Sequence, residues 1–215
     1  MEEEDTSKNA QTFKKYYLDG LRKNGTPIVL ETNELDDLAL AYVPEVLEYI
    51  ALPVPLYRQD GQSWSNDPML TEGYTIGESG CALTSFTMIA NYYGSNDHPG
   101  EVNQTLDKKA CPINWIVAGD KYGLTYGGST PVSNRTTAET IVLGALRNRT
   151  PCILFFKKGS TPHFVVATGY VRYKELDGSI HEKFYINDPS TNINYDCISD
   201  FYAKGWVMIN IRVYE

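Results

Sequence analysis

The sequence is poor in the residues that bind metals. Its 215 residues include only three histidines and four cysteines, and no two cysteines have the CxxC spacing of a zinc site. We therefore expect no metal and no other cofactor. With one cysteine kept as a free thiol, an odd number remains, which argues against a full disulfide framework. A single bridge, for example between Cys111 and Cys197, stays open.

The chain is also short of positive charge and of long apolar runs. It has 19 Lys and Arg against 27 Asp and Glu, which gives a formal net charge of -8. Because nucleic-acid affinity rests mainly on Lys and Arg that neutralise phosphates, this balance argues against DNA or RNA as a partner. No apolar run approaches the roughly 20 residues that cross a bilayer, so we expect no membrane span.

The length of the chain predicts one well-buried domain with a short appendage, because 215 residues are too few for two full-sized domains. Two helical patterns precede residue 52, the second with a break near Pro44, and they predict an N-terminal helical extension over residues 1–51. Residues 52–69 are too rich in Pro, Gly, Asp and Ser to be regular, which predicts a long ordered loop. The domain itself is expected over residues 52–215.

Helical patterns come first in this domain and strand patterns second. Apolar residues recur at helical spacing in residues 81–93, 99–110, 113–123 and 136–149, with Thr136 or Thr137 as a candidate N-cap of the last. Short runs rich in β-branched and aromatic residues follow at 151–158, 163–175, 182–189 and 206–215. Helices followed by antiparallel strands predict an α+β fold.

The stretch TIGESGCALTSFTMIANYYG, residues 75–94, is the first candidate for chemistry. It places Cys81 directly after a Glu-Ser-Gly turn and directly before an amphipathic helix. Unpaired N–H groups and the helix dipole favour a thiolate at a helix start, which is the form of cysteine that acts as a nucleophile. The alternative is that Cys81 is a small buried residue at the start of a core helix.

A nucleophilic cysteine needs a base, and only three histidines are available. His98 and His181 lie in or beside hydrophilic turns, whereas His163 opens the apolar run HFVVATGY, where a strand would fix the ring. The run FYINDPS supplies Asn187 and Asp188, either of which could orient an imidazole. If the two runs form a hairpin through residues 176–179, His163 and Asp188 come close together.

The oxyanion of an acyl-transfer reaction also needs hydrogen-bond donors. The Cys81 backbone N–H is one candidate, and the amide side chains of Gln59 and Gln62, in the loop before Cys81, are others. Either glutamine could equally be a surface residue of that loop.

These pieces together resemble a known family. The segments VPLYRQDGQSW, TIGESGCALTSFTMIANYYG, NWIVAGDKYGL, HFVVATGY and INDPS resemble, in order, the papain-fold cysteine peptidases related to the leader-cleaving domains of bacteriocin exporters, in their stand-alone bacterial branch. The resemblance covers roughly residues 52–215. It implies a papain-like fold with Cys81 as nucleophile, His163 as general base and acid, Asp188 as its orienting residue and Gln59 as oxyanion donor, with Gln62 as runner-up.

The activity that this resemblance implies is hydrolysis of peptide bonds through a thioester, without a cofactor, by a monomer acting on a peptide or protein. Two alternatives stay open: a transferase or crosslinking enzyme with the same triad, and a catalytically silent binding module. The stand-alone members are commonly exported, so we expect a secreted or cell-surface protein. The first residues, MEEEDTSKNAQ, do not resemble a signal peptide, and the alternative is the cytoplasm.

Overall fold

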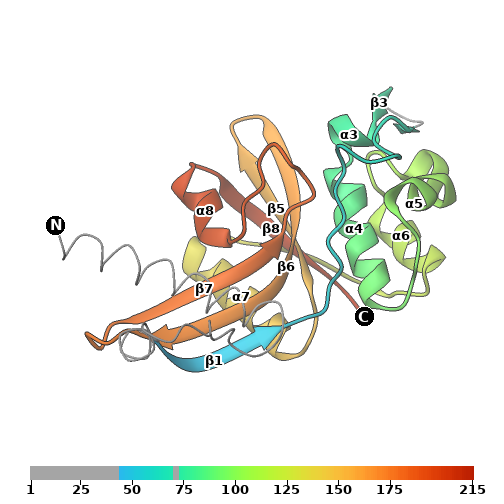
Figure 1. The fold of residues 1–215 in the computed structure, drawn as a ribbon. Coiled ribbons are helices and arrows are strands. Elements are labelled where there is room, and N and C mark those ends of the chain that lie inside the picture. The colour runs from blue at the N-terminus through green and yellow to red at the C-terminus, as the bar shows by residue number, and fades with distance from the viewer. Residues whose placement is uncertain (1–43, 70–72) are drawn as a thin grey trace, which may run out of the picture. The chain divides into compact units, whose positions relative to one another are not determined.

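The computed structural model describes residues 44–69 and 73–215, and the chain divides into two compact units (Figure 1). The described part of unit 1 consists of residues 44–51 and 169–183, and unit 2 of the remaining residues from 52 onward. Most of the helical extension predicted over residues 1–51 lies outside the described residues. The division of the chain into an extension and a domain at residue 52 stays a prediction.

Unit 1 is built from strands. Strand β1 (Glu45–Ala51) pairs antiparallel with the end of β6 (Thr161–Lys174), from Glu45 opposite Lys174 to Ala51 opposite Gly169. The prediction of a helix for residues 45–51 is therefore wrong. Their sequence, EVLEYIA, suits either structure by spacing, and pairing with β6 decides for the strand because it satisfies the backbone hydrogen bonds.

The predicted hairpin is confirmed. Strand β7 (Ile180–Asn187) pairs with β6, and the turn between them is closed by hydrogen bonds from Glu175 N to Ser179 O (2.8 Å) and from Gly178 N to Glu175 O (3.0 Å). Gly178 has a φ of 85°, a conformation that favours glycine. Both strands continue from unit 1 into unit 2.

The sheet of unit 2 is antiparallel. Its strand order is β6, β5 (Cys152–Lys158), β8 (Val207–Tyr214) and β4 (Tyr126–Pro131). Helix α7 (Arg135–Arg147) contacts β5 and β8, and the short helix α8 (Ile198–Ala203) precedes β8. Mixed helices and an antiparallel sheet confirm the α+β class.

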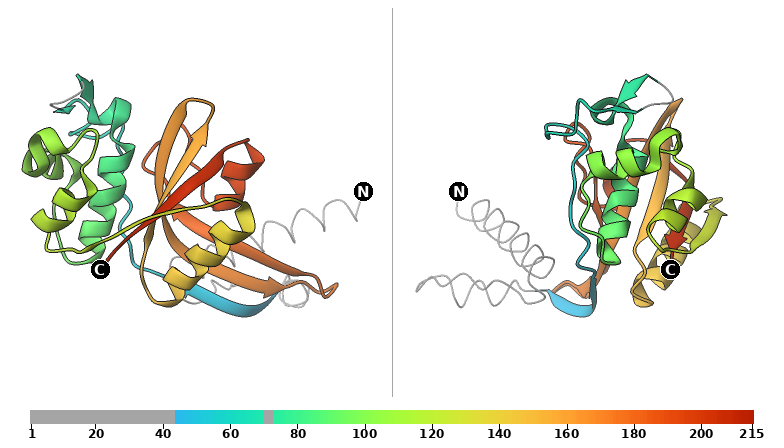
Figure 2. Two further views of the ribbon diagram at one scale, coloured as in Figure 1. Left: turned by 180° about the vertical axis from the view of Figure 1, so that it is seen from behind. Right: turned by 90° about the vertical axis from the view of Figure 1, so that its right-hand side faces the viewer.

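The other helices of unit 2 form a group of their own beside the sheet, as Figure 1 and the left view of Figure 2 show. The group consists of α3 (Ile76–Ser79), α4 (Cys81–Tyr92), α5 (Pro99–Leu106), a 3-10 turn (Asp107–Lys109) and α6 (Trp115–Lys121), with the two-residue strands β2 (Pro68–Met69) and β3 (Tyr74–Thr75) next to it. Helix α4 contacts both α5 and strand β5, and α6 contacts strand β4, so these two helices join the group to the sheet.

Two details of unit 2 differ from the sequence predictions. No strand was predicted over residues 126–131, yet β4 forms there and pairs with β8 through an irregularity between Tyr126 and Ser129. The N-cap of α7 is Asn134, whose side chain accepts a hydrogen bond from Thr137 N, rather than Thr136 or Thr137. Asparagine is as good an N-cap as threonine, so the residue type could not decide the position.

Aromatic side chains join the helix group to the sheet. Tyr214, at the end of β8, is fully buried, and its ring packs against Phe86 of α4 and Tyr126 of β4 at centroid distances of 5.4 and 5.3 Å. Its hydroxyl donates to the Trp115 carbonyl at 2.8 Å. Burying an aromatic side chain of this size contributes about 1.5–3 kcal/mol, so Tyr214 is a major contact of the core.

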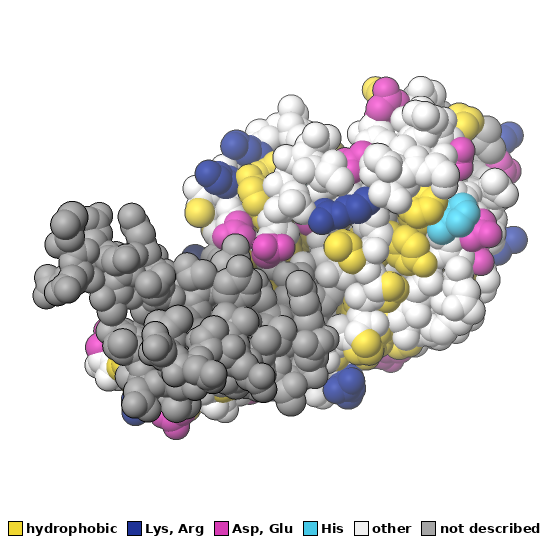
Figure 3. Space-filling view, in the orientation of Figure 1, with side chains coloured by type: hydrophobic (Ala, Val, Ile, Leu, Met, Phe, Trp, Pro, Cys, Tyr) yellow, Lys and Arg dark blue, Asp and Glu magenta, His cyan; other side chains and the backbone are white. Residues whose placement is uncertain are grey.

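Among the described residues, no helix is both long and apolar enough to span a bilayer. On the face drawn in Figure 3, basic and acidic side chains occur in small separate groups.

Candidate active site

Cys81 is the first residue of α4, at a sharp junction with α3. Helix α3 begins with a capping box between Thr75 and Glu78 and ends at Gly80, whose N–H donates to Ile76 O at 2.7 Å. A Cβ at Gly80 would lie 2.3 Å from that same carbonyl oxygen, so only glycine fits there. The junction therefore presents the half-buried thiol of Cys81 at the start of a 12-residue helix.

His163 and Asp188 form a buried pair at the ends of neighbouring strands. His163 lies near the start of β6, and Asp188 directly follows β7. The Nε2 of His163 lies 2.8 Å from Oδ1 of Asp188, and both residues are at most 3% exposed. The carboxylate also accepts hydrogen bonds from Ser190 N (2.9 Å) and Tyr195 N (3.3 Å). The orientation of Asp188 is thus set by the turn that follows it.

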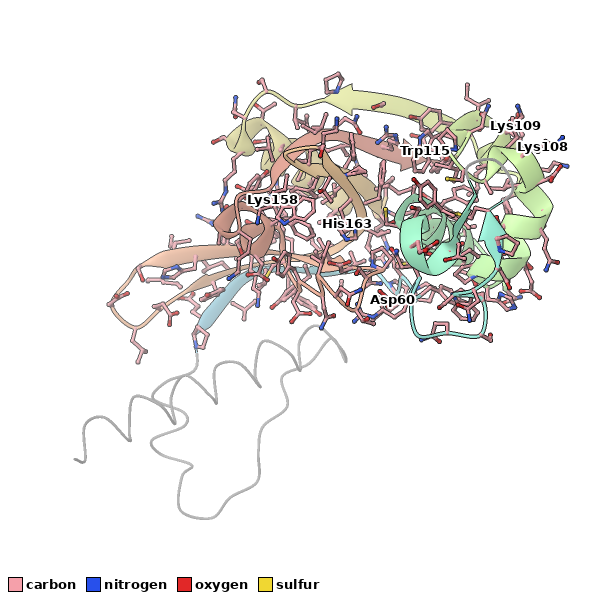
Figure 4. The ribbon with its side chains drawn as sticks, turned by 90° about the horizontal axis from the view of Figure 1, so that it is seen from above. Asp60, Lys108, Lys109, Trp115, Lys158 and His163 are labelled. Carbon is pink, nitrogen blue, oxygen red and sulfur yellow. The ribbon has the colours of Figure 1, made fainter. Side chains whose placement is uncertain are left out.

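The imidazole ring of His163, which Figure 4 labels, also has aromatic neighbours. It stacks on Phe201 of α8 at a centroid distance of 5.9 Å, and the Trp206 ring lies 6.0 Å away. These rings keep bulk water from that side of the imidazole, because all three residues are buried.

The thiol of Cys81 interacts with the imidazole of His163. Hydrogen bonding to Cys81 and the charge of Cys81 both raise the pKa of His163, and Nδ1 is the ring nitrogen that remains for the thiol because Nε2 is used by Asp188. Thiol, imidazole and carboxylate therefore lie in series, which is the arrangement in which a base can take a proton from a nucleophile while a third group stabilises the resulting charge.

This environment favours the charged imidazole. Burial alone lowers the pKa of His163, but the hydrogen bonds to Asp188 and Cys81, together with the charges of both groups, outweigh it and raise the pKa to about 9. His163 is then largely an imidazolium at neutral pH, a suitable counter-ion for a thiolate.

The two candidate oxyanion donors differ in position. Gln59 is 6% exposed, and its Nε2 donates to Gly77 O of α3 at 2.9 Å, so it lies against the helix that leads to Cys81. A primary amide has a second N–H, which remains for another acceptor. Gln62 is exposed, in a turn where its N–H donates to Ser65 Oγ.

The remaining histidines have other contacts. His98 is the N-cap of α5, accepting from Gly100 N and Glu101 N, and it stacks on Trp64 at 4.8 Å. His181 is exposed on β7 and lies 2.9 Å from Ser179 Oγ. Within residues 44–69 and 73–215, no group of three or more His, Cys, Asp or Glu could hold a metal ion.

None of the four cysteines, all of which lie in the described part of the chain, forms a disulfide, so the bridge left open between Cys111 and Cys197 is absent. Cys197 is instead buried at the start of α8, where its Sγ donates to Asp200 Oδ2 at 3.2 Å. Sequence reasoning also missed Arg58, Phe201 and Trp206, which all contact the His163–Asp188 pair or its turn. No motif distinguishes these three residues from ordinary loop and core residues.

The chain matches a known protein family. The family model of the Peptidase C39-like family matches residues 51–211, a range that includes Gln59, Cys81, His163 and Asp188. No curated protein matches the chain.

Proposed function

Because the chain belongs to the Peptidase C39-like family, as its sequence pattern predicted, we propose that it is a cysteine peptidase with Cys81, His163 and Asp188 as its catalytic triad. The observation that carries this proposal is the buried hydrogen bond between His163 and Asp188, together with the interaction of the same imidazole with Cys81, which raises the pKa of His163. A histidine with a purely structural role does not need a thiol next to one ring nitrogen and a buried carboxylate next to the other.

We also propose that the fold is papain-like in its arrangement. The nucleophile begins a helix of the helical group, and the base begins a strand of the sheet, with the orienting carboxylate at the end of the adjacent strand. With the nucleophile on a helix and the base on a strand, a substrate chain can approach the thiol from outside while the sheet keeps the base in place.

In the first half of the proposed reaction, the Cys81 thiolate attacks the carbonyl carbon of the substrate amide. A C–S bond forms, and the carbonyl electron pair moves to oxygen, where it is stabilised by the Cys81 backbone N–H and the second N–H of Gln59. The His163 imidazolium gives its Nδ1 proton to the leaving amine as the C–N bond breaks. A thioester and a neutral His163 remain.

In the second half, neutral His163 takes a proton from a water molecule that attacks the thioester. The C–S bond breaks, the carboxylic acid product leaves, and the thiolate–imidazolium pair is restored. Asp188 stabilises the imidazolium in both halves through Nε2 and keeps Nδ1 directed at the sulfur.

The proposal is tested with Cys81→Ala against a mixture of unstructured peptides. We expect hydrolysis to fall by more than about 1,000-fold, because the nucleophile is lost, while the circular dichroism spectrum and melting temperature stay close to wild type. Cys111→Ala is the matched control, since Cys111 is also a half-buried free thiol, and it should keep full activity.

Alkylation provides a second readout. Iodoacetamide at pH 6 should modify Cys81 much faster than Cys111, because the proposed imidazolium of His163 stabilises the Cys81 thiolate. Hydrolysis by Cys81→Ala, or equal alkylation rates at the two cysteines, would contradict the proposed role of Cys81.

A further inference from the structure

Three consecutive residues of the loop before Cys81 bind the turn that follows Asp188. Arg58 Nη1 donates to Asp188 O at 2.7 Å and to Ser190 O at 3.0 Å, and Gln59 N donates to the intervening Pro189 O at 2.8 Å. Three successive carbonyl groups are therefore fixed by residues about 130 positions earlier in the chain.

Asp60 completes these contacts from the acceptor side. Its two carboxylate oxygens lie 3.0 and 3.1 Å from Thr191 N, and Oδ2 also accepts from Ser190 Oγ at 3.4 Å. Figure 4 places Asp60 on the loop close to α4, with His163 on the sheet. We call residues 58–60 and their contacts to residues 188–191 the clasp.

Each of the two segments that form the clasp contains a residue of the proposed active site. On one side, Gln59 lies between Arg58 and Asp60 and is the proposed oxyanion donor. On the other, Asp188 opens the clasped turn, and its carboxylate is oriented by Ser190 N and Tyr195 N of that turn. Movement of the turn would move the carboxylate, and movement of the loop would move the amide.

We propose that Arg58 and Asp60 are positioning residues, which hold the oxyanion donor Gln59 and the orienting carboxylate Asp188 in one rigid frame. The inference rests on the proposed function, because it assigns these residues a task in that reaction. The inference extends the proposed function, because the position of the His163–Asp188 pair and the position of Gln59 would then depend on the same contacts.

The chemistry of Arg58 suits this task. A guanidinium has several N–H groups in one plane and stays charged, so it can serve two carbonyl groups and the Asn194 side chain, to which Nη2 donates at 2.7 Å, at the same time. A lysine offers a point charge on a flexible stem and can serve fewer acceptors at a fixed geometry.

The loop side of the clasp is itself anchored. Trp64 Nε1 donates to Arg58 O and Ser65 Oγ donates to Gln59 O, both at 2.9 Å. Trp64 in turn stacks on His98, the N-cap of α5. The frame is thus supported by the helical group, and the turn after Asp188 is the part that it holds in place.

The test compares Arg58→Ala, Arg58→Lys and Asp60→Asn with the wild type. We expect Arg58→Ala and Asp60→Asn to lower kcat by about 10- to 100-fold, because small misplacements of reacting groups cost this much, with KM changed by less than about threefold. Arg58→Lys should recover part of kcat, since it can still donate to Asp188 O.

Nuclear magnetic resonance titration of the His163 imidazole gives a readout independent of turnover. In Arg58→Ala and Asp60→Asn the pKa of His163 should fall below its wild-type value, because a loosened Asp188 bonds the imidazolium less well. Arg172→Ala and Asp177→Asn are matched controls, an exposed arginine paired with Glu182 and a turn aspartate that accepts Ser179 N, and neither should change kcat or the titration.

The outcomes separate the two proposals. A wild type without peptide hydrolysis would end the proposed function, while the titration would still decide whether the clasp positions Asp188. Variants with a lowered melting temperature but wild-type kcat and wild-type His163 titration would show that the clasp only stabilises the fold, which overturns the inference. Should Arg58→Ala fail to fold, Arg58→Lys and Asp60→Asn decide by the same two measurements.

Discussion

At the residue scale, the hydrogen bond between His163 and Asp188 decides which nitrogen of the imidazole faces Cys81. Because Nε2 is engaged by Asp188 at 2.8 Å, Nδ1 is the atom that exchanges protons with the sulfur and with the leaving amine in the proposed reaction. The same bond adds to the stability of the charged ring in a buried place, where burial alone would keep it neutral.

Replacing Asp188 by Asn should therefore change how activity depends on pH. In the wild type, kcat/KM should decline as pH rises through about 9, where His163 loses its proton. In Asp188→Asn this decline should begin at lower pH, because burial then opposes the imidazolium without the carboxylate, and the maximal rate should fall by about 100-fold or more. A pH–rate profile of both proteins checks this, with Asp120→Asn on α6 as control. An alkaline limb that stays in place would be incompatible with the role given to Asp188.

The same pair makes folding stability depend on pH. The pKa of His163 is raised from 6.5 to about 9 on folding, so its stabilising contribution is complete below pH 6.5 and is lost as pH rises through 9. This rise corresponds to about 3 kcal/mol. We expect the difference in unfolding free energy between wild type and His163→Gln to shrink by about this amount from pH 6 to pH 9.5, as measured by urea unfolding. A difference that is constant over this range would contradict the assignment.

At the scale of elements, the junction of α3 and α4 depends on the absence of a side chain at Gly80. A Cβ there would lie 2.3 Å from Ile76 O and 2.7 Å from Ile76 Cγ2, so the two helices would have to separate. Since Cys81 begins α4, the position of the thiol depends on this close contact.

Gly80→Ala should lower the unfolding free energy by about 1–3 kcal/mol and reduce the rate of peptide hydrolysis as well. Gly144→Ala in α7 is the matched control, because no atom lies within 4 Å of the added Cβ, and it should raise stability by about 0.4–1 kcal/mol. Thermal melts and peptide assays measure stability and hydrolysis in both variants. Equal effects of the two substitutions would show that the close contact at Gly80 does not determine stability or activity.

The elements that could be predicted from sequence are those with a strong period. Helix α4, the β6–β7 hairpin and β8 were expected within a few residues of their bounds, because their apolar residues recur at helical spacing or in runs typical of strands. Strands β1 and β4 were not, because pairing with a neighbour forms them in spite of a helix-like and a turn-like sequence. Local composition contains no information about the partner strand.

The residues of the candidate site also divide into those that could be predicted from the sequence and those that could not. Cys81, His163 and Asp188 stand at the ends of predictable elements, and the hairpin alone was enough to expect that the last two meet. Arg58 was not expected, because its acceptors are main-chain carbonyl groups, which every residue has, about 130 positions away. Contacts of this kind depend on the folded geometry of two irregular loops.

At the scale of unit 2, Tyr214 links the helical group to the sheet. It is 0% exposed, its ring packs on Phe86 and Tyr126, its hydroxyl bonds to Trp115 O, and its own carbonyl accepts from Tyr93 Oη at 2.7 Å. The residue therefore contacts α4, α6 and β4 from the last strand of the chain.

Tyr214→Ala should lower the unfolding free energy by about 3–5 kcal/mol, because it removes a buried aromatic ring and leaves the Trp115 carbonyl without its hydrogen-bond donor. Native-state hydrogen exchange in this variant should show amides of α4 and of β8 losing protection together. Tyr74→Ala, at a site that is 49% exposed, should change stability by less than about 0.5 kcal/mol. Protection lost in β8 alone would indicate that the two groups of elements unfold separately.

The buried ring of Trp206 has its centroid 6.0 Å from that of His163, which gives the molecule an optical reporter of the charge on its proposed catalytic base. A neighbouring imidazolium quenches indole emission far more than a neutral imidazole does. The emission of Trp206, taken as the difference between the wild type and Trp206→Phe, should brighten as pH passes about 9. The charge on His163 then becomes visible in the protein without a substrate.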